Sequence, residues 1–187
     1  MKTKFIVFII AVVIFIGGLG FYLNRQPSGP GKLDGFAQAL TNSGVTFYGA
    51  FWCPHCQSQK AEFGSSVKYL SYVECSNPDS TPVQVCTDNK VEAFPTWEFR
   101  NGIKITSSSE PTICPIKKEG VTLEGVCVNN ASEYYRVWFF SGHKFSVKSP
   151  TDPVKTGDVW QFPQKVQAVG EVPLEFLAEQ IQFTLPQ

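Results

Sequence analysis

The run Cys53-Pro54-His55-Cys56 constrains the fold of this chain more than any other feature. The residues before it, 45–52, are β-branched, aromatic or small, and they predict a buried strand that leads directly into the motif. The residues after it, 57–70, are rich in helix formers and carry spaced apolar side chains. Pro54 has the position that proline favours in the first turn of a helix. The sequence therefore predicts that the two cysteines lie where a strand gives way to a helix.

Two cysteines at this spacing can close a disulfide and reopen it, so the pair can carry two electrons. A helix N-terminus stabilises negative charge, and Cys53 is therefore the expected nucleophilic thiolate. We expect Cys53 to face solvent and Cys56, one turn into the helix, to be the buried resolving thiol. The alternatives are a zinc site and a static disulfide. A zinc site normally needs a second close pair, which the sequence does not offer. We therefore expect no metal and no cofactor beyond the redox-active disulfide.

His55, between the two cysteines, bears on the direction of electron flow. A hydrogen-bond donor or a positive charge at this position stabilises the thiolate, and with it the reduced form. A protein whose reduced form is stabilised is an oxidant. The alternative is an exposed histidine with little effect on the pair. The sequence thus favours an oxidising protein in which Pro54 and His55 belong to the catalytic motif.

The N-terminus predicts a membrane anchor. Two lysines precede an uncharged apolar run, residues 5–23. A helix of that length spans about 28 Å, close to the ~30 Å hydrocarbon core of a bilayer. Positive charge before the run favours a cytoplasmic N-terminus, with the rest of the chain on the extracytoplasmic (periplasmic) side of the inner membrane. The alternative is a cleaved signal peptide with residues 17–20 as its small-residue region, although no A-x-A site is present. We expect a single-pass anchor over residues 1–24 and a linker over residues 25–32.

Six cysteines, an even number, suit an oxidising compartment. We expect structural disulfides between Cys75 and Cys86 and between Cys114 and Cys127, although four cysteines allow three connectivities. The chain has 16 basic and 16 acidic residues and no basic stripe, so its charge does not indicate nucleic-acid binding. An aromatic content of 14% with only 17% charged residues indicates a packed core rather than disorder.

The remaining pattern predicts an alternation of helices and strands, followed by a β-rich segment. An Asn101-Gly102 pair is a strong hairpin signal. Residues 134–147 read as a second hairpin, and the last helix is expected to be amphipathic, with Leu174, Leu177 and Ile181 on one face. The other expected elements are a helix over 33–42, a strand over 69–74, a short helix over 83–91, strands over 94–99 and 103–105, and a final helix over 173–182.

At this point the residues resemble a known family. The strand, the Trp-Cys-x-x-Cys run, the helix and a later Phe-Pro-Thr strand resemble the thioredoxin fold. The closer resemblance is to the thioredoxin-like domain associated with bacterial homologues of vitamin K epoxide reductase. It covers residues 33–105 and 166–182, about half of the chain. The resemblance implies an α/β, thioredoxin-like domain over residues 33–187, with a β-rich insertion at about 106–163 before the last strand and helix. The residues that carry it are 33–37, 48–57, 72–75, Cys86, 94–98, 170–171 and 174–178.

The resemblance also implies roles for residues outside the motif. Pro95 is expected to be cis and to face the cysteine pair, where the backbone of Phe94 would pair with a substrate strand. The alternative is an ordinary proline at a strand edge. Trp52, Phe94 and Thr96 are the expected substrate-binding residues. The Pro-His pair is also found in the bacterial oxidant DsbA. Thioredoxin carries a buried Asp six residues before its first cysteine, and Phe47 stands there in this chain, which weakens a reductase interpretation.

These observations predict a membrane-anchored thiol–disulfide oxidoreductase that donates disulfides to exported proteins. Its electrons would pass to a quinone-linked membrane oxidase of the vitamin K epoxide reductase or DsbB type, and anchoring would raise the effective concentration near that oxidase. A reductase or isomerase of the same fold is the first alternative. An isomerase usually needs a dimer, and with no dimerisation segment evident we expect a monomer. The second alternative is a non-enzymatic binding module that recognises a partner through the 134–147 hairpin.

Overall fold

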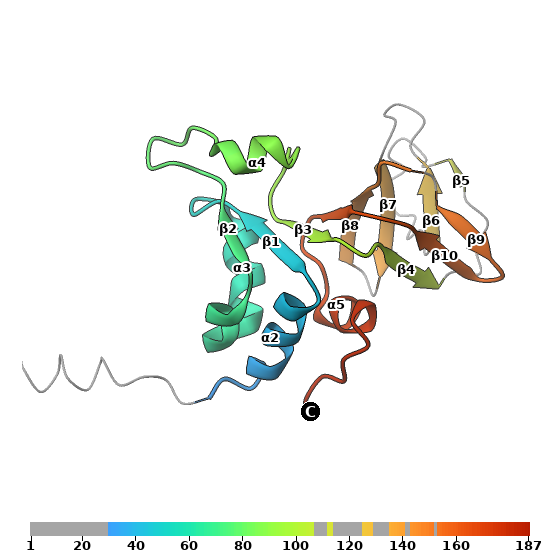
Figure 1. Cartoon of the computed structure of the whole chain (residues 1–187), viewed down its shortest axis with the longest axis horizontal. Helices are drawn as coiled ribbons and strands as arrows, with labels where there is room; N and C mark the ends of the chain where they lie inside the picture. Colours follow the sequence, from blue (N-terminus) through green and yellow to red (C-terminus); the bar gives the residue numbers. More distant parts are fainter. Residues whose placement is uncertain (1–29, 107–111, 114–124, 129–134, 141–142, 152) are drawn as a thin grey trace, which may run out of the picture. The chain divides into compact units, whose positions relative to one another are not determined.

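The computed structural model describes residues 30–106, 112–113, 125–128, 135–140, 143–151 and 153–187. Helices and strands alternate in the first half of the described chain, whereas residues from 103 onward are mostly β-stranded up to a final short helix (Figure 1). The elements are α2 (Asp34–Asn42), β1 (Val45–Gly49), α3 (Pro54–Phe63), the 3-10 helix η1 (Gly64–Tyr69), β2 (Tyr72–Glu74), α4 (Gln84–Asp88), β3 (Thr96–Phe99), β4 (Ile103–Thr106), β5 (Thr112–Ile113), β6 (Gly125–Val128), β7 (Tyr135–Phe140), β8 (His143–Lys148), β9 (Val154–Thr156), β10 (Val159–Phe162), β11 (Val166–Val169) and α5 (Leu174–Gln180).

The main sheet is mixed, with the strand order β2-β1-β3-β11-β8-β7-β6-β5. Strand β1 pairs with β2 in parallel and with β3 antiparallel. A parallel pair needs a crossover connection, which α3 and η1 supply between β1 and β2. The predicted α/β class is confirmed, and this mixed sheet is consistent with a thioredoxin-like fold.

The Asn101-Gly102 turn does not close a hairpin, so this prediction was wrong. Strand β3 pairs with β1 and β11, while β4 pairs with β10 in a separate three-stranded sheet of order β4-β10-β9. Gly102 has φ +74°, and a Cβ on it would run into the backbone oxygen of Phe162. Asn101-Gly102 specifies a local chain reversal that only glycine tolerates at residue 102. After the reversal the chain enters β4, which belongs to the second sheet.

Strands β5 to β8 and β11 continue the main sheet. The predicted hairpin over residues 134–147 is confirmed, because β7 and β8 pair antiparallel. Strand β8 in turn pairs with β11, and Val147 lies opposite Ala168. Strands β5 to β8 of the 106–163 segment therefore share one hydrogen-bonded sheet with β1, the strand before the cysteine motif, whereas β9 and β10 belong to the second sheet.

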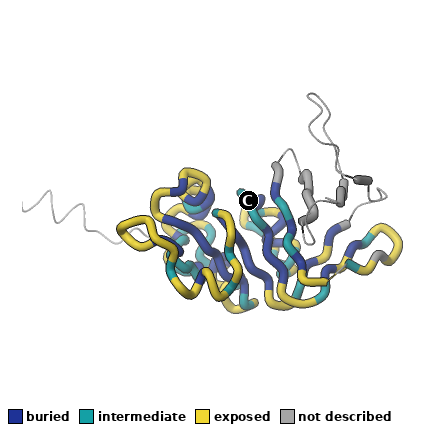
Figure 2. The backbone as a smooth tube through the Cα atoms, turned by 90° about the horizontal axis from the view of Figure 1, so that it is seen from above, coloured by how far each residue is buried: buried dark blue, intermediate teal, exposed yellow. Residues whose placement is uncertain are grey.

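A large apolar cluster packs against β1 and β3, next to two smaller clusters that each contain two cysteines. Helix α2 contributes Phe36, Ala37 and Leu40 to it, and Phe47 stacks on Trp97 at 4.5 Å. The buried stretches follow neighbouring strands, while the loops between them are exposed (Figure 2). Helix α5 packs Leu174 and Leu177 against the large cluster, with Ile181 just beyond its end, as the sequence predicts. It buries Phe176, Leu177 and Ala178, whereas Leu174 and Ile181, near the ends of this short helix, are only half-buried.

Cys75 and Cys86 are joined by a disulfide with a Cα–Cα distance of 5.6 Å. Both residues are 2% exposed, and the bond ties the chain just after β2 to α4. Cys114 lies outside the described residues, so its bond with Cys127 stays a prediction.

Replacing both Cys75 and Cys86 with alanine is expected to lower the free energy of unfolding by about 2–3 kcal/mol, because a cross-link of this loop length restricts the unfolded chain. Urea unfolding of the full chain under non-reducing conditions measures the change. A loss below about 0.5 kcal/mol would contradict a structural role for the bond.

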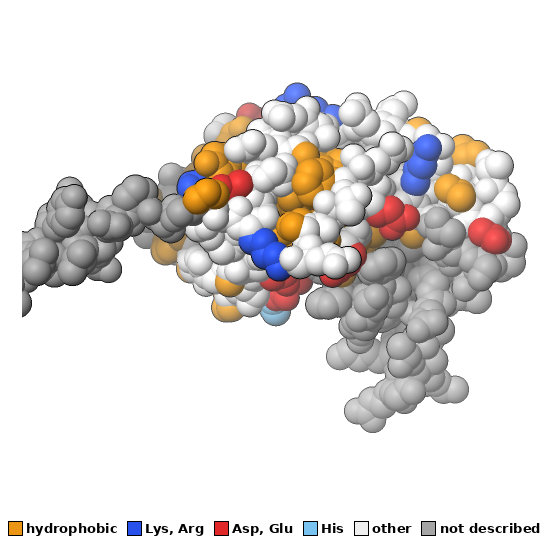
Figure 3. All heavy atoms as spheres, turned by 90° about the horizontal axis from the view of Figure 1, so that it is seen from below, with side chains coloured by type: hydrophobic (Ala, Val, Ile, Leu, Met, Phe, Trp, Pro, Cys, Tyr) orange, Lys and Arg blue, Asp and Glu red, His pale blue; other side chains and the backbone are white. Residues whose placement is uncertain are grey.

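None of the helices that the structure describes is long and apolar enough to cross a membrane. Residues 5–23 lie outside the described part of the chain, so the anchor stays a prediction. On the face drawn in Figure 3, basic and acidic side chains are scattered among neutral ones in small groups.

Candidate redox site

The cysteine motif lies where the chain passes from β1 into α3, as the sequence predicts. Cys53 is the N-cap of α3, with extended backbone angles (φ −80°, ψ 116°), and Pro54 begins the helix. The Cys56 N–H donates to Cys53 Sγ at 3.3 Å. The Cys53 sulfur therefore takes the place of a capping oxygen at the positive end of the helix dipole. This position stabilises negative charge on Cys53.

Both thiols are free in this structure, and both are buried. Cys56 is 0% exposed and Cys53 is 5% exposed, so the expectation that Cys53 faces solvent was wrong, although it is the more exposed of the two. Ala50 packs with both cysteines, and Phe94 covers the cluster. Burial, followed by the hydrogen bond with Cys53, raises the pKa of Cys56 to about 12. Cys56 therefore keeps its proton at neutral pH.

An apolar rim borders the pair. Phe51 and Trp52 are about half exposed, and the Trp52 ring meets Phe94 edge-on at 6.1 Å. The Trp52 indole N–H donates to Ser76 Oγ at 2.8 Å, which fixes the orientation of the ring. The structure thus brings Trp52 and Phe94 together beside the cysteines.

The loop that carries Phe94 leads into β3 through a cis peptide bond to Pro95. Pro95 is buried, and the Gly170 N–H donates to its carbonyl oxygen at 2.9 Å. Thr96, expected to bind substrate, is 1% exposed, and its hydroxyl donates to the carbonyl oxygen of Ala93 at 2.7 Å. Its side chain therefore faces the protein interior and is not presented to a substrate.

His55 has a partner that sequence reasoning missed. Its Nδ1 lies 2.6 Å from Glu171 Oε1, with the imidazole 72% exposed and the glutamate side chain 30% exposed. The two residues are 116 positions apart, on α3 and on the turn after β11. Nothing in the local pattern around Glu171 could have placed it beside the motif. The imidazole is thus fixed at the surface by a carboxylate.

One turn along α3, Gln59 makes a buried connection to the same turn. Gln59 is 0% exposed. Its Oε1 accepts from the Val172 N–H at 2.7 Å and from the Trp97 indole at 3.2 Å. Its Nε2 donates to the Val172 carbonyl at 3.1 Å and to Glu62 at 2.8 Å. We refer to these four hydrogen bonds as the Gln59 clamp.

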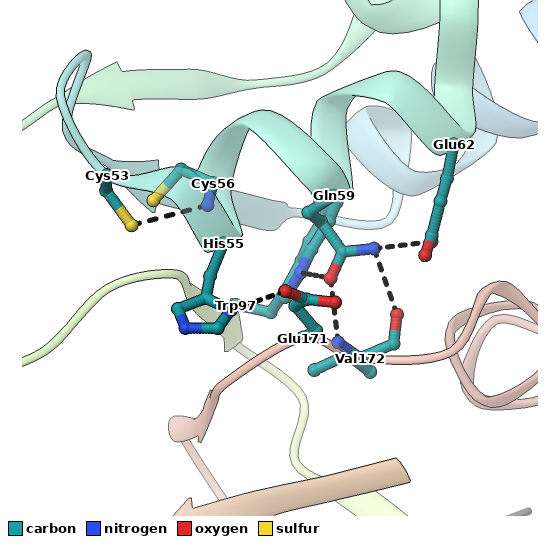
Figure 4. Close-up of polar contacts among 8 residues, drawn as sticks. All are labelled: Cys53, His55, Cys56, Gln59, Glu62, Trp97, Glu171 and Val172. Atoms are coloured by element: carbon teal, nitrogen blue, oxygen red, sulfur yellow. Dashed lines mark hydrogen bonds and ion pairs between the residues drawn. The ribbon is translucent and has the colours of Figure 1, made fainter.

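Figure 4 shows His55 and Gln59 reaching from α3 to the adjacent residues Glu171 and Val172. The exposed contact and the buried clamp therefore act together, because a backbone fixed at Val172 holds the Glu171 carboxylate against the imidazole. Among the residues that the structure describes, no group of three or more His, Cys, Asp or Glu side chains could hold a metal ion.

No protein-family model matches the chain. Among curated proteins, the thiol-disulfide oxidoreductase LTO1 of Arabidopsis thaliana is 45% identical to this chain over 67 residues. The match covers 33% of this chain and spans 18% of the length of LTO1. Over that stretch the chain is homologous to a thiol–disulfide oxidoreductase.

Proposed function

We propose that this chain is a thiol–disulfide oxidoreductase that donates disulfides to exported proteins through Cys53 and Cys56. The observation that carries the proposal is the asymmetry of the pair. Cys53 Sγ caps the N-terminus of α3, whereas Cys56 is fully buried and holds its proton. An exchange pair needs one sulfur that accommodates negative charge and a second that stays protonated until it is used. The partial match to LTO1 supports the same chemistry.

In the proposed reaction a substrate thiolate attacks Cys53 Sγ of the oxidised pair. The Cys53–Cys56 bond breaks, Cys56 leaves and takes up a proton, and a mixed disulfide remains on Cys53. The second thiolate of the substrate then attacks that bond, and Cys53 leaves as a thiolate. The substrate is oxidised by two electrons and the pair is reduced by two.

The proposed direction rests on His55 and on Phe47. Glu171 holds the imidazole beside the motif, and Phe47 stands where thioredoxin has its buried Asp. Phe47 is fully buried between Tyr72 and Trp97. The absence of the thioredoxin carboxylate and the presence of the histidine favour an oxidant over a reductase.

We further propose that residues 1–24 anchor the chain in the inner membrane, with the redox domain on the extracytoplasmic side. A quinone-linked oxidase of the vitamin K epoxide reductase or DsbB type would reoxidise it there. The apolar run 5–23 supports the anchor, and the resemblance to thioredoxin-like domains associated with vitamin K epoxide reductase homologues supports the oxidase.

The reduction potential of Cys53–Cys56 tests the direction. The full chain in mild detergent is equilibrated against glutathione buffers, and the reduced fraction is counted by alkylation and mass measurement. We expect a value near about −120 mV, typical of strong oxidants, because the reduced form is stabilised at the helix N-terminus. A value near about −270 mV would make the protein a reductase. If Cys53–Cys56 resists reduction as strongly as Cys75–Cys86, the protein would be the non-enzymatic binding module and not an oxidoreductase.

A further inference from the structure

Cys56 has to lose and regain a proton in every cycle of the proposed reaction, yet it is fully buried. Its pKa of about 12 means that the thiolate is rare at neutral pH. Thioredoxin's buried Asp is absent at the corresponding position, where Phe47 stands. A cycle of useful rate therefore needs another group that takes the proton from Cys56.

Tyr72 on β2 places its hydroxyl on the same side of Gly49 as this sulfur. A Cβ placed on Gly49 would lie 3.2 Å from Cys56 Sγ and 3.3 Å from the Tyr72 hydroxyl oxygen. The thiol and the hydroxyl thus border the same glycine, where a side chain would crowd both of them. The Tyr72 ring packs on Phe47 at 5.4 Å, so the residue that replaces the thioredoxin carboxylate also supports the tyrosine.

Glu74 continues the path from Tyr72 towards solvent. The Tyr72 hydroxyl donates to Glu74 Oε2 at 2.7 Å. The other oxygen, Oε1, accepts from the backbone N–H groups of Phe51 at 3.0 Å and Ser76 at 3.1 Å, which hold the carboxylate in place. Glu74 is half-buried, so it can exchange protons with water. Burial, then the hydrogen bond to Glu74, raises the pKa of Tyr72 far above its usual value. Tyr72 therefore keeps its own proton and can only relay one.

The other charged groups around Cys56 do not offer an acceptor. From α3, Cys53 shares the reaction itself and Lys60 is a cation whose Nζ lies 3.6 Å from the centre of the Tyr72 ring. His55, also on α3, is engaged by Glu171 at the surface. The residue that covers the cysteines from the loop before β3 is Phe94, which carries no charge. Glu74, reached through Tyr72, is the acceptor that remains among these groups.

We propose that Tyr72 and Glu74 form the proton path of the resolving cysteine, an inference that rests on the proposed function. During reoxidation, Cys53 first forms a mixed disulfide with the oxidant. The Cys56 proton then passes to the Tyr72 oxygen while the Tyr72 proton passes to the Glu74 carboxylate. The Cys56 thiolate attacks Cys53 Sγ, the Cys53–Cys56 bond forms, and the oxidant's sulfur leaves as a thiolate. When the pair oxidises a substrate, the same path returns a proton to Cys56.

Single-turnover reoxidation tests the proposal. The reduced full chain in mild detergent is mixed with glutathione disulfide, quenched with acid and analysed by mass. Attack by Cys53 appears as a glutathione adduct, and attack by Cys56 appears as loss of that adduct. The adduct-loss rate is measured from about pH 6 to about pH 9 for the native chain, Tyr72→Phe and Glu74→Gln. Tyr69→Phe is the matched control, because Tyr69 also lies beside a lysine but on η1.

We expect Tyr72→Phe and Glu74→Gln to slow adduct loss about 100-fold at neutral pH, with adduct formation unchanged. Their rates should rise about tenfold per pH unit, because hydroxide then has to remove the proton. The native chain and Tyr69→Phe should depend on pH more weakly. Tyr72→Phe keeps the ring that packs on Phe47, and the amide introduced by Glu74→Gln keeps an oxygen for the N–H groups of Phe51 and Ser76.

Native rates and pH profiles in both variants would overturn the proposal, and so would slower loss with the native pH profile, which indicates a structural role. If the reduced native chain forms no glutathione adduct at all, the proposed function itself fails.

Discussion

Replacing Cys53 with serine is expected to reduce disulfide formation in a reduced two-cysteine peptide to the uncatalysed rate. Cys53 is the sulfur that caps α3 and the more exposed of the pair, and a serine hydroxyl cannot form the mixed disulfide. The measurement is peptide oxidation by the full chain under multiple-turnover conditions, with glutathione disulfide as the oxidant that restores the pair. Retained turnover would show that the chemistry does not run through this pair.

The companion variant, Cys56→Ser, distinguishes the role of Cys56 from that of Cys53. Cys53 can still attack the disulfide of an oxidised two-cysteine peptide, forming a mixed disulfide and releasing one peptide thiolate. The buried thiol that would then displace the peptide is missing, so a covalent complex should accumulate. Non-reducing gels and mass measurement detect this complex. The mass also reports whether Cys75–Cys86 remains intact, which serves as the folding control.

Replacing Gln59 with methionine is expected to lower the free energy of unfolding by about 3–5 kcal/mol. Methionine has a similar volume but no amide. The Val172 N–H, the Val172 carbonyl and the Trp97 indole would each lose a buried hydrogen bond. Urea unfolding gives the magnitude.

Gln84→Met is the matched control for this effect. Gln84 lies exposed on α4 and donates to Asp88 at 2.7 Å, so its loss should change stability by less than about 0.5 kcal/mol. Equal effects of the two substitutions would mean that the Gln59 clamp contributes no more than a surface hydrogen bond.

The sequence predicts well those features that neighbouring residues decide. The strand before the motif, the helix after it and the buried face of α2 follow from side-chain periodicity and from Pro54. The 134–147 hairpin follows from two runs rich in aromatic and β-branched residues on either side of Ser141-Gly142. These patterns need no knowledge of the rest of the chain.

Features decided by distant residues escaped prediction. The Asn101-Gly102 turn packs against the backbone of Phe162, which is distant in the sequence. The partner of His55 is Glu171, which follows the β-rich segment in the sequence. Gln59 reads as an ordinary polar residue in a helix, and only the Val172 backbone makes it a buried anchor. Cys53 is buried because Ala50 and Phe94 close around it. The periodicity of the sequence does not predict which distant residues will be in contact.

The separation of Gln59 from Val172, 113 residues, has a consequence for biosynthesis. A chain made from its N-terminus presents Cys53 and Cys56 long before the segment that completes the clamp exists. In that interval Cys53, Cys56 and the later cysteines belong to a chain that has not finished folding. Non-native disulfides form most easily in that state. Strand β3 also cannot pair with β11 until that strand, about 70 residues later in the sequence, has been made, and such non-local pairing is slow. The newly made protein is therefore itself a substrate for the kind of chemistry it is proposed to perform.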